Sequence, residues 1–363
     1  MGGQFRVLDT GVREGRFNIA LDQAMIEARQ SGLIPDTFRF IRFPPTALIG
    51  RHQALSQEID LDYCRARGVG IVRRITGGGA IYLDEGQLGW GLVFDRNTLG
   101  LASLADVASE ICEAVAAGLG ELGVEARYRP RNDIEVNGRK ISGTGGFFDG
   151  DTLIYQGTVL VDMRPADMVA ALRVPRAKLA KRDLDSAEQR VVTLRELLGD
   201  EAPTLADTQR VLLDAFAKRF GIDWVAGELT DEEMRLARQR FDEEIGQDEF
   251  VAEIDDPAGA GDLATGEQTG PGGTVTTYLR LDGPQGSRVS QILITGDFFV
   301  APPRTVYDLE GALRGCPTDD VPAEVERFFR KRSVSALSVT PDDFLESIRA
   351  ALASARVRRA EAE

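Results

Sequence analysis

The chain has 363 residues, 43% hydrophobic and 28% charged, which is typical of a globular protein long enough for two or three domains. Its net charge of -15 argues against broad binding to nucleic acid or to anionic membranes. No apolar run approaches the roughly 20 residues needed to cross a bilayer. The N-terminus shows no signal-peptide pattern, so we expect a cytoplasmic protein.

Hydrophobic periodicity predicts alternating strands and helices in the first part of the chain. We expect strands at residues 5–9, 37–43, 46–50, 68–72, 88–94 and 124–128, and helices at 15–30, 58–67 and 101–122. His52 follows one of these strands in a polar loop, where a lone histidine without a recognisable partner is more often structural than catalytic. Cys112 lies in the clearest helix and is most simply a small core residue.

A glycine-rich stretch, Arg73-Arg-Ile-Thr-Gly-Gly-Gly-Ala-Ile-Tyr-Leu-Asp84, separates two of the predicted strands. Three consecutive glycines let the backbone adopt turn conformations and approach a ligand closely. Such runs also occur in ordinary turns, so this stretch alone is better interpreted as a turn. Its functional interpretation depends on a second stretch further along the chain.

The second stretch, residues 129–146, combines a hairpin signal with cationic and glycine residues. Asn137-Gly138 is the strongest short-range hairpin signal, so the segments before and after it are predicted to be antiparallel strands. This hairpin brings Asn132 and Asp133 near Lys140. The following Ile-Ser-Gly-Thr-Gly-Gly is predicted to be a second glycine-rich loop, and this setting favours a functional lysine over an ordinary surface one.

The remainder of the chain is predicted to complete the first domain, residues 1–250, and to add a second one. We expect a strand at 153–161 that places Gln156 opposite Tyr155, and helices at 204–220 and 230–245, the latter with a solvated charged face. Residues 254–273 are rich in Asp, Gly, Ala, Thr and Pro, which predicts a flexible linker. Strands at 274–281 and 289–295 and helices at 306–313, 323–329 and 341–358 then predict a compact α+β domain at 274–363.

The cationic residues of the two stretches concentrate positive charge in an otherwise acidic chain; they are Arg73, Arg74, Arg129, Arg131 and Lys140. Together with glycine-rich backbone they suit a ligand that carries phosphate or carboxylate. Arginine binds anions bidentately, whereas lysine is a point charge that can stabilise charge growing on a reacting oxygen. The Gly-x-x-x-x-Gly-Lys-Ser/Thr and Gly-x-Gly-x-x-Gly fingerprints of other nucleotide folds are absent from the sequence.

Both stretches resemble those of the lipoate-protein ligases, which belong to the wider biotin and lipoate ligase fold. The first is similar to the family motif Arg-Arg-x-x-Gly-Gly-Gly-Ala-Val-x-His-Asp, and residues 132–143 resemble its Asn-Asp and Gly-x-Lys-Ile-Ser-Gly motif. Further matches are Gly50-Arg51 and the pattern of Lys181, Ser186, Arg190-Val191 and Leu194. In addition, Gly296-Asp297-Phe298-Phe299 is similar to part of the accessory domain of the long ligases.

The resemblance implies an α+β fold with a mixed, largely antiparallel sheet flanked by helices, plus a small α+β accessory domain. It implies that lipoate and ATP, with Mg²⁺, form lipoyl-adenylate, which then acylates a lysine of a lipoyl carrier protein or domain. The carrier would be of the GcvH or dehydrogenase E2 kind, and the enzyme a monomer. Whether octanoate is also accepted stays open.

The resemblance also assigns residue roles. Lys140 would be the catalytic contact that holds the carboxylate and α-phosphate oxygens. The residues expected to bind ATP and lipoyl-adenylate are Arg74, Thr76, Gly77, Gly78, Gly79, Ala80, Tyr82, Asn132, Asp133, Ser142, Gly143 and Thr144. Asp133 would also orient Mg²⁺, and Arg51 and Gln156 are candidate substrate contacts.

Three positions depart from the family pattern and put the acyl substrate and the carrier in question. Leu83 stands in place of its usual His, Gln87 in place of its Asn, and Gln156 at a strand position often held by His. The leucine can neither titrate nor form a hydrogen bond.

Two alternatives stay open beside the ligase. An octanoyl or lipoyl transferase of the same fold needs a thiolate beside the acyl tunnel, and no cysteine lies between Cys112 and Cys316. A non-catalytic lipoate-binding module is disfavoured by the presence of Lys140. A biotin ligase fits less well, because its Lys-Trp-Pro-Asn-Asp motif is here Arg129-Pro-Arg-Asn-Asp.

Overall fold

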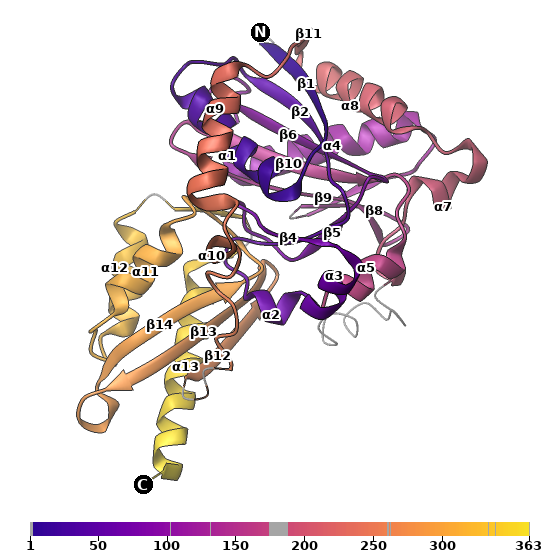
Figure 1. Cartoon of the computed structure of the whole chain (residues 1–363). Helices are drawn as coiled ribbons and strands as arrows, with labels where there is room; N and C mark the ends of the chain where they lie inside the picture. The colour runs from indigo at the N-terminus through magenta and orange to yellow at the C-terminus, as the bar shows by residue number, and fades with distance from the viewer. Residues whose placement is uncertain are drawn as a thin grey trace.

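The computed structural model describes residues 3–362 except 102, 131, 174–187, 260, 262, 333 and 338. Arg131, Lys181 and Ser186, which the sequence marks as candidates, therefore lie outside the described residues. A large sheet with its helices forms the upper part of Figure 1, and a smaller sheet with its own helices forms the lower part. No described helix combines the length and the apolar character that a membrane span requires.

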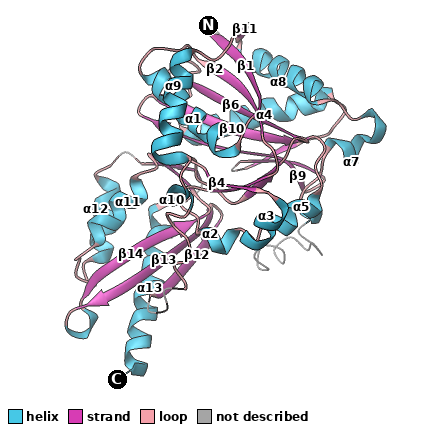
Figure 2. Cartoon of the chain, in the orientation of Figure 1, coloured by secondary structure: helices cyan, strands magenta, loops and turns pink. Residues whose placement is uncertain are grey.

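The large sheet has eight strands and is mixed. In order across the sheet they are β11 (Asp223–Ala226), β1 (Gln4–Val12), β2 (Thr37–Arg42), β6 (Gln87–Asp95), β10 (Thr152–Leu160), β9 (Arg139–Asp149), β8 (Asp133–Val136) and β7 (Arg127–Arg129). The first three strands are parallel neighbours, and the other pairs are antiparallel. This largely antiparallel sheet flanked by helices confirms the predicted fold class (Figure 2).

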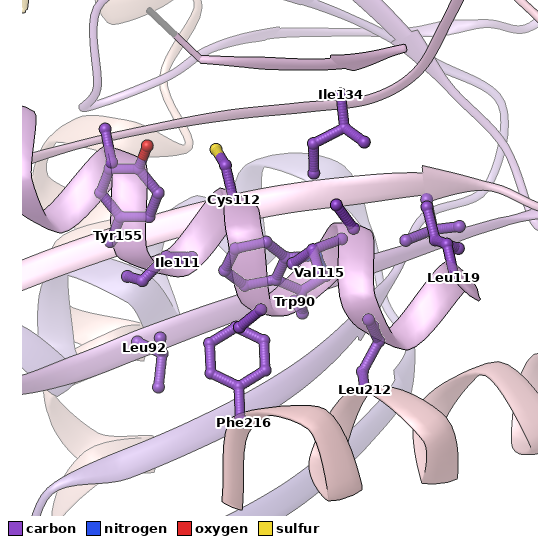
Figure 3. Close-up of a cluster of buried hydrophobic side chains, with 14 of the residues drawn as sticks. Trp90, Leu92, Ile111, Cys112, Val115, Leu119, Ile134, Tyr155, Leu212 and Phe216 are labelled. Atoms are coloured by element: carbon purple, nitrogen blue, oxygen red, sulfur yellow. The ribbon is translucent and has the colours of Figure 1, made fainter. Parts of the chain in front are cut away.

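Helices cover both faces of the large sheet. On one face α4 (Leu104–Glu121) and α8 (Leu205–Phe220) pack against Trp90 and Tyr155, and Figure 3 shows Cys112 within this apolar cluster. On the other face lie α1 (Gly15–Gln30) and α9 (Asp231–Arg240), the latter continued by a π-helical turn, η3 (Phe241–Ile245). β2, predicted from the sequence as a strand at 37–43, is therefore buried on both faces.

The predicted charged helix near residue 230 has its solvated face, but α9 also has a buried one. Glu233 is buried and its carboxylate pairs with Arg6 at 2.6 Å, while Ala237 packs into the same core as α1. Charge in a helix sequence does not reveal a buried partner on a strand more than two hundred residues away.

The predicted hairpin is confirmed by the pairing of β8 with β9. Asn137 and Gly138 have φ of 51° and 78°, the left-handed pair that a two-residue turn of this kind requires. The predicted second glycine-rich loop is wrong, because residues 142–146 continue β9 as a strand. β9 is paired on both sides, with β8 and β10, and this pairing overrides the low strand propensity of glycine.

A second small sheet holds the triple-glycine stretch. β3 (Thr46–Ile49) lies between β4 (Gly70–Arg73) and β5 (Ile81–Leu83), so the loop from β4 to β5 contains all three glycines. Short helices lie beside this sheet: α2 (Leu55–Glu58), α3 (Leu61–Arg67), α5 (Pro165–Ala171) and α10 (Asp248–Val251). Another short helix, α7 (Leu194–Leu198), follows the undescribed segment.

The C-terminal part has its own sheet and apolar core. β12 (Ala264–Gly270), β13 (Gly273–Asp282) and β14 (Arg288–Gly296) form the sheet, accompanied by α11 (Thr305–Leu313), α12 (Val321–Arg330) and α13 (Pro341–Ala362). β15 (Phe299–Ala301) pairs with β16 (Ser335–Leu337) beside the large sheet.

The predicted linker is wrong over residues 264–270, which form β12. Ala264 is buried, and β12 pairs with β13 along its whole length. Glycine, proline, aspartate and alanine are depleted in strands and therefore indicated a linker, but pairing and packing decide here. The backbone N–H of Leu55 bonds the Ile254 carbonyl at 2.8 Å, so the start of the segment is also fixed. The division into two domains stays a prediction.

Candidate active site

A cavity of about 840 Å³ lies between the large sheet, α1, the triple-glycine loop and the C-terminal sheet. Its floor is formed by β6, β10 and β9 at the centre of the large sheet. Gly89, Gly143 and Gly145 line this floor, together with the side chains of Gln156 and Thr158. The glycines on this floor let protein groups approach the sheet closely, since the Lys140 side chain ends over Gly143 and the Phe299 ring lies over Gly145.

Arg74 connects the triple-glycine loop to the cavity. Its Nη2 donates to the carbonyls of Gly77 and Gly79 at 3.0 and 2.9 Å, which fixes the loop shape. Its Nη1 is buried and has no hydrogen-bond partner among the described residues. Burial lowers the pKa of Arg74 to about 10, so the group is still cationic at neutral pH. An anion in the cavity would satisfy this buried donor.

Lys140 and Asp133 form an ion pair at the wall of the cavity. The Lys140 Nζ lies 2.8 Å from Asp133 Oδ1, and Arg129 pairs with the other carboxylate oxygen. Burial alone would raise the pKa of Asp133, but Lys140 and Arg129 outweigh burial and lower it to about 2. The carboxylate is therefore ionised and holds the ammonium of Lys140 beside the cavity.

Asp133 is a poor metal ligand in this arrangement, because both of its oxygens already bond cations. The described residues contain no group of three or more His, Cys, Asp or Glu side chains that could hold a metal ion. A Mg²⁺ ion would therefore depend on phosphate oxygens and water for most of its ligands. Binding of Mg²⁺ through Asp133 stays a prediction.

Asn132 and Thr144 position the segment that precedes Asp133. Asn132 Nδ2 donates to the Thr144 carbonyl at 2.7 Å, and Thr144 Oγ1 donates to the Asn132 carbonyl at 3.1 Å. Thr144 Oγ1 also lies 2.8 Å from the hydroxyl of Tyr155 and 3.3 Å from Cys112 Sγ. Both residues line the cavity, but their polar groups are largely used in these contacts.

Most of the predicted ligand-binding residues line this one cavity. They are Arg74, Thr76, Gly77, Gly79, Ala80, Tyr82, Asn132, Asp133, Lys140, Gly143, Thr144 and Gln156. Three predicted contacts do not line it. Ser142 is buried, Gly78 donates its N–H to the Phe298 carbonyl at 3.0 Å, and Arg51 lies over the rings of Phe250 and Tyr307.

Two residues near the first stretch have structural roles. Arg73 is buried and donates to main-chain carbonyls, among them those of Gln53 at 2.7 Å and Ile254 at 2.9 Å. His52 is buried and stacks on Phe298, and burial lowers its pKa to about 3. Neither residue lines the cavity, in keeping with the structural interpretation of His52.

Residues of the C-terminal part also line the cavity, which the sequence did not predict. Thr274, Asp297 and Phe299 are among them. The Phe299 ring lies so close to Gly78 and Gly145 that a Cβ atom on either glycine would overlap it. The Gly296-Asp297-Phe298-Phe299 segment was the available signal, but its sequence does not say which surface it contacts.

The far arm of the cavity, here called the acyl arm, is lined by apolar side chains of one cluster: Ile19, Ile41, Phe43, Leu48 and Leu83. Asp22 of α1 lines the cavity as well and pairs with the buried Arg39 at 2.7 Å. Burial raises the pKa of Asp22, and Arg39 opposes this rise. Sequence reasoning missed Asp22, although it lies on the buried face of the predicted helix 15–30.

Comparisons with known proteins agree on one family. The model of the lipoyl protein ligase A/B catalytic domain matches residues 14–217. An octanoyltransferase LipM of Kyrpidia tusciae is 31% identical over 260 residues, covering 65% of this chain and 94% of that protein. A crystal structure of lipoate-protein ligase A bound with ATP is 26% identical with a TM-score of 0.61, covering 70% of this chain and 100% of that one.

The C-terminal part also has a structural counterpart. The structure of Plasmodium falciparum LipL1 in complex with lipoate has a TM-score of 0.69 and covers 92% of this chain and 95% of that one. Its sequence is 17% identical, so the likeness concerns the fold.

Proposed function

Because the chain belongs to the lipoyl protein ligase A/B catalytic domain family, and is thus an enzyme of the lipoate ligase and transferase class, we propose that it is an ATP-dependent lipoate-protein ligase. One observation carries this proposal. The cavity joins a cationic end to an apolar arm, and no cysteine lines it among the described residues.

The cationic end suits the anionic parts of ATP and of the acyl-adenylate. Arg74 offers a buried N–H without a partner among the described residues, and Lys140 offers an ammonium group that also lines the cavity. The backbone of Gly77 and Gly79 can approach a ligand closely. The similar lipoate-protein ligase A is bound with ATP in its crystal structure, which supports a nucleotide here.

The cysteines favour the ligase over a thioester-forming transferase. All three are among the described residues, and none lines the cavity. Cys112 is buried in the apolar cluster of Figure 3, with its Sγ 3.3 Å from Thr144 Oγ1, and burial raises its pKa to about 12. A nucleophilic cysteine must be accessible and ionised, so this thiol is unsuited to the task.

In the proposed reaction, the carboxylate of lipoate attacks the α-phosphorus of ATP, and the bond to pyrophosphate breaks. Lys140 would stabilise the charge that grows on the phosphoryl and carboxylate oxygens, and Arg74 would bind an anionic oxygen. Mg²⁺, when bound with ATP, would neutralise the leaving pyrophosphate. A lysine amine of the lipoyl carrier then attacks the acyl carbon, loses a proton and displaces AMP.

A second candidate is an octanoyl transferase that takes its acyl group from a carrier protein. The names of similar relatives favour it, such as the octanoyltransferase of Kyrpidia tusciae. This candidate would need Cys112 to become exposed during turnover. Four further statements belong to the proposal in either case: the roles of the site residues named above, a carrier of the GcvH or dehydrogenase E2 kind, the accessory domain, and the monomeric state.

The discriminating experiment gives the purified protein the same acceptor, a lipoyl carrier domain, in two reactions. The first contains lipoate, ATP and Mg²⁺. The second contains no ATP and supplies the acyl group as an octanoyl thioester on a carrier protein. Intact mass of the carrier domain reports acylation. We expect acylation only in the first reaction, and undiminished acylation by a Cys112→Ala variant. Acylation in the second reaction, abolished in Cys112→Ala, would replace the ligase by the transferase.

A further inference from the structure

A buried chain of polar groups ends at the wall of the acyl arm. Arg39 is 1% exposed and donates from Nη1 to Asp22 Oδ1 at 2.7 Å and from Nη2 to Asn18 Oδ1 at 2.6 Å. The other oxygen of Asp22 accepts a hydrogen bond from Gln156 Nε2 at 2.7 Å. Gln156 and Asp22 both line the cavity. The apolar arm of the cavity thus contains the amide of Gln156, which Asp22 holds in place.

The orientation of this amide follows from hydrogen-bond chemistry. A carboxylate paired with a buried guanidinium accepts hydrogen bonds and cannot donate them, so Gln156 must turn its nitrogen toward Asp22. The amide nitrogen carries two hydrogens, and Asp22 uses one. Within the described part of the chain, no other hydrogen bond of the Gln156 amide is seen, which leaves its second N–H for a ligand.

The position of Gln156 matches the distal end of a medium-length acyl chain. Gln156 pairs across the sheet with Gly145, whereas the end of the Lys140 side chain lies over Gly143 of the same strand. Two Cα positions that differ by two residues along a strand and by one strand across the sheet are about 8 Å apart. A Cβ placed on Gly91 would lie 3.4 Å from Gln156 Cγ and 3.6 Å from Ile41 Cδ1, so polar and apolar groups converge there.

We propose that Gln156, oriented by Asp22, is a specificity-determining residue that makes the site favour a lipoyl group over a plain alkyl acyl group. This inference rests on the proposed function, because it takes the acyl carboxylate to lie at Lys140. The dithiolane ring of lipoate carries sulfur atoms, which are weak hydrogen-bond acceptors and polarisable. An octanoyl tail offers no acceptor, so it would cover the half-buried amide N–H without pairing with it, at a cost.

A matched set of three acids tests this proposal by binding calorimetry on the whole protein. Lipoate carries the sulfurs, 5-cyclopentylpentanoate has the same ring size without them, and octanoate has neither sulfur nor ring. We expect lipoate to bind about tenfold more tightly than the cyclopentyl acid, as for a buried amide left without a partner. In Gln156→Leu this ratio should fall close to one, whereas the surface control Gln30→Leu should keep it.

Several outcomes would overturn the inference. Equal binding of lipoate and the cyclopentyl acid to the wild-type protein would do so, as would no binding of either acid. A tenfold ratio that persists in Gln156→Leu would also contradict it. If that variant fails to fold in a thermal scan, Gln156→Met supplies the same loss of the N–H with a flexible side chain.

Failure of the proposed function is distinguishable from failure of this inference. Selective binding of lipoate without ATP-dependent carrier acylation would remove the ligase and keep the role of Gln156. Carrier acylation that proceeds equally with all three acids would keep the ligase and remove the role of Gln156.

Discussion

Neighbouring arginines in this chain have different roles because a guanidinium group can bond in several directions at once. Arg73 donates to main-chain carbonyls and stabilises the fold. Arg74 uses one nitrogen to hold the glycine loop and leaves another for a ligand. Arg129 pairs with Asp133 and Glu135, beside Lys140. The role of each cation is thus set by its neighbours rather than by its charge.

The first prediction at this scale concerns Lys140. Lys140→Met should lower the rate of lipoate-dependent ATP–pyrophosphate exchange by about 10²- to 10³-fold, as expected for loss of one preorganised donor to the transition state. Because Lys140 also pairs with the largely buried Asp133, the melting temperature should fall as well, and exchange is therefore measured at a temperature where the variant is folded. Lys140→Arg keeps the charge and is the matched control, with a smaller loss. Full exchange activity of Lys140→Met would remove Lys140 from the site.

The second residue-scale prediction concerns Glu310, which is buried in the C-terminal part and accepts a hydrogen bond from the Ile294 N–H at 2.7 Å. Burial raises its pKa from 4.5 to about 7. The folded state therefore holds a proton that the unfolded state loses, so the free energy of unfolding falls as pH rises from 4.5 to 7. The loss amounts to about 3 kcal/mol above pH 7.

Glu310→Gln removes this penalty and keeps the hydrogen-bond acceptor. We expect a higher melting temperature than wild type at pH 8 and little difference at pH 4, read by calorimetric scans. The exposed Glu326→Gln is the control and should have no such pH-dependent effect. A stabilisation that is equal at both pH values would contradict the titration of Glu310.

At the scale of the elements, the hairpin of β8 and β9 is the unit that builds the cationic site. Asp133 begins one strand, Lys140 lies near the start of the other, and the turn, together with a register shift between Ile134 and Glu135, fixes which residues face each other. Register in a hairpin is set by its turn. The geometry of the ion pair therefore depends on two residues, Asn137 and Gly138, that lie outside the cavity.

The element-scale prediction is that Gly138→Val weakens both stability and activity. Gly138 has φ of 78°, a conformation that costs a residue with a side chain about 1–2 kcal/mol. We expect a lower midpoint in urea unfolding and a reduced rate of pyrophosphate exchange. Asn137→Gly, which keeps a residue suited to positive φ, is the control and should retain most activity. Unchanged unfolding of Gly138→Val would show that the turn does not fix the hairpin.

At the scale of the whole molecule, the C-terminal part lies below the large sheet in Figure 1, and several of its residues line the cavity. Its contacts to the larger part include the hydrogen bonds from Gly78 N–H to the Phe298 carbonyl at 3.0 Å and from Gly296 N–H to the His52 carbonyl at 2.9 Å. The Phe299 ring lies against Gly78 and Gly145. The two parts thus share the site.

The whole-molecule prediction is a coupling between Gly145 and Phe299. Gly145→Ala should destabilise the protein by about 1–3 kcal/mol, because the new methyl group overlaps the Phe299 ring. Phe299→Ala removes the obstacle, so the double variant should be less destabilised than the sum of the two single variants. Urea unfolding of all four proteins measures this cycle. Strictly additive effects would mean that the ring does not press on Gly145.

The sequence by itself determined what depends on local chemistry. Hydrophobic periodicity placed most helices and strands, Asn137-Gly138 predicted the hairpin, and two motifs identified the family and a set of residues most of which line the cavity. These signals work because turn conformation and side-chain alternation are set by residues next to each other in the chain. They could not show that residues 142–146 or 264–270 are strands, because pairing partners decide this.

Only the tertiary structure decided which groups meet across long stretches of chain. Asp22 reaches Gln156, Phe299 covers Gly145, and Cys112 is hidden behind Thr144, although no local pattern links the members of any pair. The same holds for Ser142 and Arg51, which the motifs indicated but which packing turns away from the cavity. Burial and direction of a side chain are properties of the assembled layers, and they set both the reactivity of a thiol and the selectivity of an amide.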